Sequence, residues 1–139
     1  VTNVRGWACW QLGPYQNEIA LKRLEDPVLK DVVANAKATP NRSNTNNFIN
    51  LAEYRLHFEA WSKAIEALNK ARDEDEKGFR TSYIEQLRAV ACCGLDKFQP
   101  AKKILDTMTP EERGKLLSDY PILEKMARDS KYHDMFPGR

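Results

Sequence analysis

Apolar residues recur along most of this chain at intervals of three and four. Residues 58–71 read FEAWSKAIEALNKA, and helical spacing places their apolar residues on one side of a helix, namely Trp61, Ala64, Ile65, Leu68 and Ala71. We find no convincing alternation of apolar and polar residues, which would indicate strands. The sequence therefore predicts an all-α fold, with comparable stripes in residues 2–12, 15–24, 28–36, 48–56, 84–95, 98–105 and 122–127.

Turn and cap residues predict where these helices begin and end. Asp26–Pro27 has the pattern of a helix start, with proline at the first helical position, and the polar run Asn41–Asn47 is typical of a loop. Gly78 follows a charged turn and can take a left-handed cap, while Asp96 is placed as an N-cap. The sequence TPEE at Thr109–Glu112 predicts a capping box.

The chain also shows an internal repeat when it is shifted by 37 residues. Small residues then meet small residues, and aromatic residues meet aromatic ones. The matched pairs are Ala52 with Ala89, Phe58 with Leu95, Trp61 with Phe98, Ala64 with Ala101, and Leu68 with Leu105. A fixed period of this size is typical of stacked helical hairpins, and small residues suit the place where two helices cross closely.

On these residues the sequence resembles the tetratricopeptide repeat (TPR) family, whose unit is a helical hairpin of about 34 residues. The segments LAEYRLHFEAWSKAIEALNKA (Leu51–Ala71) and AVACCGLDKFQPAKKIL (Ala89–Leu105) carry the resemblance. Arg55 departs from it, since a large apolar residue is expected there, and so does Met108, which replaces an alanine.

The resemblance implies a single TPR-like domain over residues 1–139, a solenoid of about three antiparallel hairpins with a C-terminal closing helix. A degenerate hairpin occupies 1–40, two TPR-like repeats occupy 46–108, and closing helices occupy 109–136, the last of them starting near Asp119 and Pro121. Because the chain starts with Val1, we read it as processed or as a piece of a longer protein.

Composition excludes some classes of function. Hydrophobic residues make up 42% and charged residues 30% of the chain, as in an ordinary globular protein. The formal net charge of +2, with bases and acids interleaved, predicts no nucleic-acid binding. No apolar run approaches the ~18 residues of a membrane span. We therefore expect no membrane insertion and a cytoplasmic location.

The residues that could carry chemistry are few. Cys9, Cys92 and Cys93 are interpreted as small apolar residues in a reducing compartment. A redox or metal role for Cys92–Cys93, or a cysteine–histidine nucleophile with His57 or His133, is the alternative. Known catalytic and phosphate-binding motifs are missing. We predict no enzyme activity, no metal and no cofactor.

By the resemblance, the function is a scaffold for protein–protein interaction that binds a peptide or helix on its concave face. The candidate partner-binding residues are Asn46, Ile49, Asn50, Glu53 and His57 in one repeat, and Tyr83, Gln86, Leu87, Val90 and Cys93 in the next. The family's clamp for a C-terminal carboxylate needs cations and amides. We expect no such clamp, because Ile49, Glu53, Gln86 and Leu87 stand at its positions.

Two other classes stay open at this point. The chain can be a regulatory or linker module attached to a catalytic domain, such as a kinase or protease, that lies outside this sequence. It can also be a helical repeat that binds nucleic acid, although the balanced charge disfavours this. The role of Trp7 and Trp10, as core anchors or as a docking patch, is likewise open.

Overall fold

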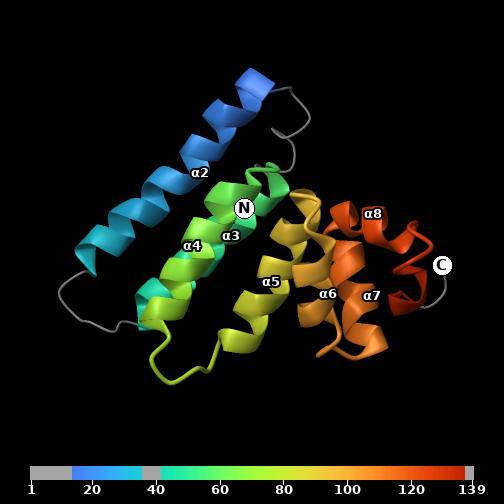
Figure 1. Cartoon of the computed structure of the whole chain (residues 1–139). Helices are drawn as coiled ribbons and strands as arrows, with labels where there is room; N and C mark the ends of the chain where they lie inside the picture. Colours follow the sequence, from blue (N-terminus) through green and yellow to red (C-terminus); the bar gives the residue numbers. More distant parts are fainter. Residues whose placement is uncertain (1–13, 36–41, 137–139) are drawn as a thin grey trace. The chain divides into compact units, whose positions relative to one another are not determined.

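The computed structural model describes residues 14–35 and 42–136, and within them every regular element is a helix (Figure 1). This confirms the predicted all-α class. In chain order the elements are α2 (Pro14–Ala34), α3 (Arg42–His57), α4 (Trp61–Glu74), α5 (Thr81–Gly94), α6 (Phe98–Leu105), α7 (Pro110–Asp119), the 3-10 turn η1 (Pro121–Leu123), α8 (Glu124–Ala127) and the 3-10 turn η2 (His133–Met135).

The chain divides into two compact units, Val1–Ile84 and Glu85–Arg139, with the boundary inside α5. In the first unit α3 and α4 form a hairpin, and α2 packs along α3 (Figure 1). The core of this unit includes Leu24 of α2, Ala52 and Leu56 of α3, and Ala64 and Leu68 of α4, all of them buried. In the apolar stripe predicted from residues 58–71, Ala64, Leu68 and Ala71 are buried, whereas Trp61 and Ile65 are half-buried.

Arg55 has a role in the first unit that its departure from the repeat pattern did not suggest. Its Nε lies 2.6 Å from Oε2 of Glu25 on α2, and both side chains are only 15% exposed. Its guanidinium also donates a hydrogen bond of 2.9 Å to the backbone carbonyl of Lys63 on α4. From α3, Arg55 thus links α2 to α4, which explains why a charged residue occupies a position where an apolar one was expected.

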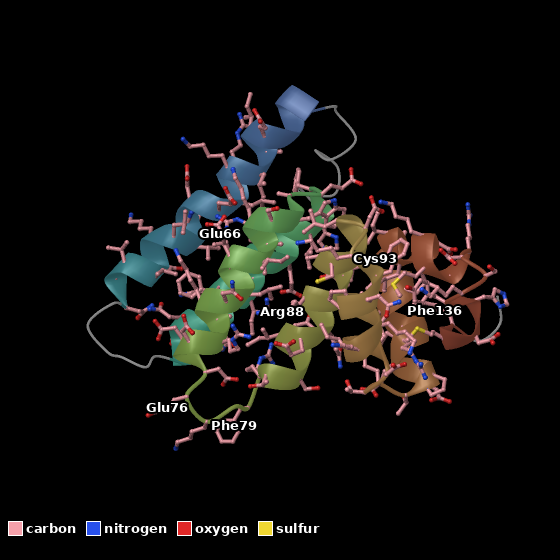
Figure 2. All side chains as sticks on the ribbon, viewed as in Figure 1. Glu66, Glu76, Phe79, Arg88, Cys93 and Phe136 are labelled. Carbon is pink, nitrogen blue, oxygen red and sulfur yellow. The ribbon has the colours of Figure 1, made fainter. Side chains whose placement is uncertain are left out.

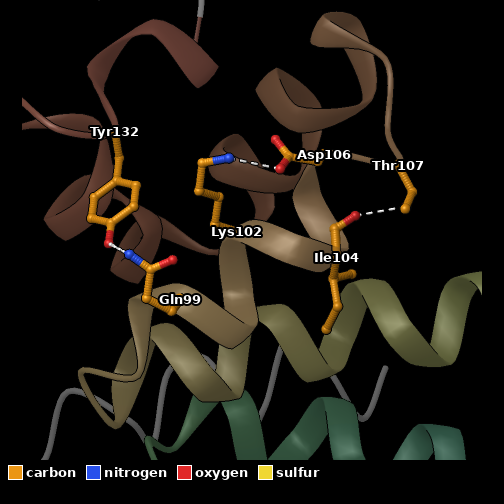
Figure 3. A network of polar contacts seen from close by, with 6 residues as sticks. All are labelled: Gln99, Lys102, Ile104, Asp106, Thr107 and Tyr132. Atoms are coloured by element: carbon orange, nitrogen blue, oxygen red, sulfur yellow. Dashed lines mark hydrogen bonds and ion pairs between the residues drawn. The ribbon is translucent and has the colours of Figure 1, made fainter.

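The second unit is held together by contacts between α6 and the C-terminal turns. The Gln99 side chain donates a hydrogen bond of 3.0 Å to the hydroxyl of Tyr132 (Figure 3). The Phe98 ring meets the Tyr132 ring edge-on, with 5.7 Å between the ring centres. Phe136, near the end of the chain, is 1% exposed. The C-terminal segment therefore contributes to the core of this unit.

Three predicted helix boundaries are wrong. Pro27 lies inside α2 instead of starting a helix. The run Asn41–Asn47 belongs mostly to α3, because Asn44 and Thr45 are buried and Asn44 donates a hydrogen bond to the carbonyl of Val32. Asp96 is not an N-cap, since Lys97 takes that position. In each case the local preference of the residue is outweighed by neighbouring structure.

Other predicted boundaries are confirmed. Thr109 and Glu112 form a complete capping box at the start of α7, with both reciprocal hydrogen bonds present. Gly78 adopts the predicted left-handed conformation, with φ of 72°, but it does not cap α4, because that helix ends at Glu74 and its C-cap is Asp75. Pro121 starts a helical segment, although it is a short 3-10 turn that leads into α8 rather than one longer helix.

The helix ends repeat at the predicted period. α3 ends at His57 and α4 begins at Trp61, and 37 residues later α5 ends at Gly94 and α6 begins at Phe98. The matched residues also share their burial. The alanine and Leu68–Leu105 pairs are all 0% exposed, namely Ala52, Ala64, Leu68, Ala89, Ala101 and Leu105, and the members of the Phe58–Leu95 and Trp61–Phe98 pairs are all half-buried.

The turn between α3 and α4 and the turn between α5 and α6 repeat in their hydrogen bonds as well. In the first, the amide of Ala60 donates to the carbonyl of Arg55 over 2.8 Å, and in the second the amide of Lys97 donates to Cys92 over 2.8 Å. Each bond spans five residues and closes a Schellman motif, which requires a left-handed residue just before the donor. Both turns thus end their first helix in the same way.

The left-handed residues of these motifs are Glu59, with φ of 61°, and Asp96, with φ of 60°. They too are 37 residues apart, and neither is glycine. Side chains other than glycine are uncommon in this region and are strained there. Two non-glycine residues thus take the left-handed conformation at equivalent positions of the two turns. The conformational preferences of Glu and Asp do not explain this, so it is a structural repeat.

Some predictions fall on residues that the structure does not describe. Cys9, Trp7 and Trp10 lie outside the described ranges, as does part of the hairpin predicted for residues 1–40. That hairpin and the single domain over residues 1–139 therefore stay predictions.

Candidate functional site

The ten predicted partner-binding residues divide into buried and accessible sets. Four of them belong to the core and cannot line an open surface, with exposures of 1% for Ile49 and 0% for Leu87, Val90 and Cys93. This corrects the predicted groove. Their apolar side chains gain more from burial than a solvent-facing position would allow. The six accessible residues are Asn46, Asn50, Glu53, His57, Tyr83 and Gln86.

Four of these six residues lie on one side of α3. Asn46 and Asn50 are exposed, and Glu53 and His57 are half-buried. Because they follow one another at intervals of four, three and four residues, they form a continuous line along the helix, which we call the α3 stripe. Gln86 lies in the second unit and Tyr83 in the first.

The structure brings Glu53 together with Tyr83, although they are 30 residues apart in the sequence. The Tyr83 hydroxyl donates a hydrogen bond of 2.6 Å to Oε2 of Glu53. The guanidinium of Arg80 lies 5.3 Å from the centre of the Tyr83 ring, within the range of a cation–π contact. A carboxylate on α3 is thus held by an aromatic residue that a nearby cation also contacts.

Burial raises the pKa of the Glu53 carboxyl above its ordinary value of 4.5. The hydrogen bond from Tyr83 and the charge of Arg80 act in the opposite direction and are the smaller effects. Carboxylates with a shifted pKa are frequent at functional sites, and they also occur in ion pairs that have only a structural role.

The raised pKa predicts a pH dependence of stability. The unfolded chain releases the Glu53 proton at lower pH than the folded chain, so the contribution of Glu53 to stability is greatest below pH 4.5 and declines as pH rises through its folded pKa. We expect Glu53→Gln to abolish this decline, because the amide cannot ionise but can still accept from Tyr83. Urea unfolding of both proteins between about pH 4 and pH 7 measures the difference.

The same change at Glu66, which is exposed on α4, is the matched control. If the wild-type protein gains stability relative to Glu53→Gln as pH rises, the desolvation of Glu53 is not the dominant effect.

A cleft that the sequence analysis missed lies at the end of the hairpin in the first unit. It has a volume of about 230 Å³ and is lined by Thr45, Glu74, Asp75, Glu76, Lys77, Phe79 and Arg80. We call it the α4–α5 cleft. Figure 2 shows Glu76 and Phe79 on the turn that joins α4 to α5. The sequence predicts only a charged turn before Gly78, and a single phenylalanine after such a turn is no recognisable signal of a site.

Hydrogen bonds of Asp75 order this turn. Its Oδ2 accepts from the backbone amide of Arg80 over 2.9 Å and from the hydroxyl of Thr81 over 3.2 Å. Asp75 therefore ties the end of α4 to the beginning of α5. Phe79, within this ordered turn, is 72% exposed.

The cysteines of the second unit are buried. Cys92 is 7% and Cys93 0% exposed, and the Cys93 thiol donates to the carbonyl of Ile122 over 3.5 Å. Burial raises the pKa of both thiols, that of Cys93 to about 11. Within the part of the chain that the structure describes, no three His, Cys, Asp or Glu side chains are grouped closely enough for a metal.

Because the thiolate is the reactive form, we expect both cysteines to react slowly with an aromatic disulfide reagent at neutral pH. Denaturation should make them react within the mixing time. Peptide mapping by mass spectrometry assigns the labelled sites. Rapid labelling of Cys92 and Cys93 in the native protein would contradict their burial. A redox or metal-binding role for these two cysteines would then have to be considered again.

Comparisons of the chain with protein-family models, with curated proteins and with solved structures find no match. The resemblance to TPR hairpins therefore stays a prediction from the sequence. Across residues 14–35 and 42–136, every helix is too short or too polar to cross a bilayer.

Proposed function

We propose that this chain is a non-enzymatic protein-binding scaffold, built as a TPR-like solenoid of helical hairpins with closing helices at its C-terminus. The observation that carries the proposal is the hairpin turn that recurs after 37 residues with the same hydrogen bonds and the same left-handed residue. Arrays of repeated hairpins present the first helix of each unit on a common surface, where a peptide or helix can bind.

The α3 stripe supplies the chemistry of such a surface in the first unit. Asn46 and Asn50 are exposed, and their side-chain amides can both donate to and accept from a peptide backbone. Glu53 and Tyr83 are tied to each other and so are already ordered before a partner arrives. A surface ordered in advance loses less conformational entropy on binding.

A cytoplasmic location is part of this proposal. Cys92 and Cys93 are free and buried, as is usual for cysteines that remain reduced in such a compartment.

The experiment is a selection of peptides from a random display library against the whole chain. Affinities of the selected peptides are then measured for Asn50→Ala and Glu53→Gln, with Lys103→Ala on the exposed face of α6 as the control. We expect at least about fivefold weaker binding for both α3-stripe variants, because Asn50→Ala removes amide contacts and Glu53→Gln removes the charge of the carboxylate. Asn50→Ala should hardly change the melting temperature, since Asn50 is exposed. Selected peptides that bind all variants equally, or a selection that yields no peptide, would refute the proposal.

A further inference from the structure

The α4–α5 cleft combines an exposed aromatic ring with several carboxylates. Phe79 keeps 72% of its surface exposed, although its turn is ordered by Asp75. Aromatic side chains, phenylalanine among them, are enriched at protein interfaces. The volume of the α4–α5 cleft, about 230 Å³, lies below the roughly 300–1,000 Å³ of sites that bind drug-sized ligands. The cleft is therefore sized for a single side chain of a partner.

The charges of the cleft select the chemistry of that side chain. Glu74, Asp75 and Glu76 stand at the C-terminal end of α4, where the helix dipole is already negative. These three acids share the lining with two bases, Lys77 and Arg80, which leaves the cleft with a net negative charge that attracts a cation from a partner. Of the two basic residues in the lining, Arg80 already contacts the Tyr83 ring.

We propose that the α4–α5 cleft binds an arginine side chain of a partner protein, with the guanidinium lying over the Phe79 ring and paired with the carboxylates of the cleft. This inference rests on the proposed function, because it names the chemistry of the partner segment. A planar guanidinium is suited to such a site, since it stacks on aromatic faces and forms two parallel hydrogen bonds to a carboxylate. Thr45 of α3 also lines the cleft, so the site includes a residue of the helix that carries the α3 stripe.

The test uses the whole ¹⁵N-labelled chain and three short alanine-based peptides that carry arginines, glutamates or phosphoserines. Two-dimensional NMR titrations report which backbone amides shift and give the affinities. We expect the arginine peptide to shift the amides of residues 74–80, and its binding to weaken as salt is raised, because the carboxylates near the surface are screened.

Two pairs of variants assign the site. Phe79→Ala should weaken binding of the arginine peptide about tenfold. Val33→Ala should leave it unchanged, since Val33 is an apolar residue on α2 with a similar exposure of 75%. Glu76→Gln should weaken binding about threefold, whereas Glu66→Gln, an exposed acid on α4, should not. Because Phe79 and Glu76 are both exposed, these variants should remain folded.

Tighter binding of the glutamate or phosphoserine peptide at the same amides would overturn the inference, as would an unchanged affinity for Phe79→Ala. The outcome is separable from that of the proposed function. Selected peptides that depend on the α3 stripe but do not shift residues 74–80 refute the arginine site alone. If the arginine peptide binds Phe79→Ala more weakly, but the selected peptides bind the α3-stripe variants as tightly as the wild-type protein, only the proposed binding surface is refuted.

Discussion

Replacing Arg55 by methionine is expected to lower the free energy of unfolding by about 2–4 kcal/mol. Methionine keeps most of the length of the side chain but removes its charge. The Glu25 carboxylate, whose side chain is 15% exposed, then loses its partner, and the carbonyl of Lys63 loses a hydrogen bond. Leaving a largely buried charge without compensation is the main cost. Chemical denaturation of the purified variant measures the change.

Two controls accompany this variant. In the double variant Arg55→Met and Glu25→Met neither charge remains, so we expect part of the lost stability to return. Lys115→Met breaks an ion pair with Asp119 on α7 whose side chains are 82% and 53% exposed, and it should change stability by less than about 0.5 kcal/mol. If Arg55→Met unfolds at the same denaturant concentration as the wild-type protein, the link between α2 and α4 contributes nothing to stability.

Leucine in place of Ala64 or Ala101 is expected to destabilise the fold by about 1–3 kcal/mol in each case. Both alanines are 0% exposed, and they occupy the same register in α4 and α6, three residues after the aromatic residue that begins each helix. The added side-chain carbons have no space in a close-packed core and must displace their neighbours. Thermal or urea unfolding measures each variant.

Ala34→Leu is the matched substitution at an exposed alanine, the last residue of α2, and should change stability by less than about 0.5 kcal/mol. Similar losses at Ala64 and Ala101 would agree with equivalent sites in a repeat. If both variants melt like the wild-type protein, the register of 37 residues is wrong.

Several features of the fold could be predicted from local patterns. The stripe with Ala64, Leu68 and Ala71 predicted the buried side of α4, because residues three and four apart necessarily share one side of a helix. The capping box at Thr109 was predictable for a similar reason, since both of its hydrogen bonds join residues within four positions of each other. Local backbone geometry alone generates such signals.

The candidate site was predictable only in part. The α3 stripe follows from helical spacing, but that spacing could not show that Ile49 turns to the core while Asn50 stays exposed. The α4–α5 cleft escaped the sequence analysis because a charged turn gives no sign that it is ordered. Asp75 orders it through hydrogen bonds to Arg80 and Thr81, and whether such bonds form depends on the path of the backbone.

By itself the sequence determined the all-α class, the side of α4 that is buried and the period of 37 residues, since all three depend on residue type and spacing. Tertiary structure alone decided that α2 continues through Pro27 and that Thr45 is buried. It also decided that Arg55 forms an ion pair with Glu25, 30 residues earlier in the sequence. The physical reason is that a preference of one residue amounts to about 1–3 kcal/mol at most, and packing and charge pairing across helices can exceed it.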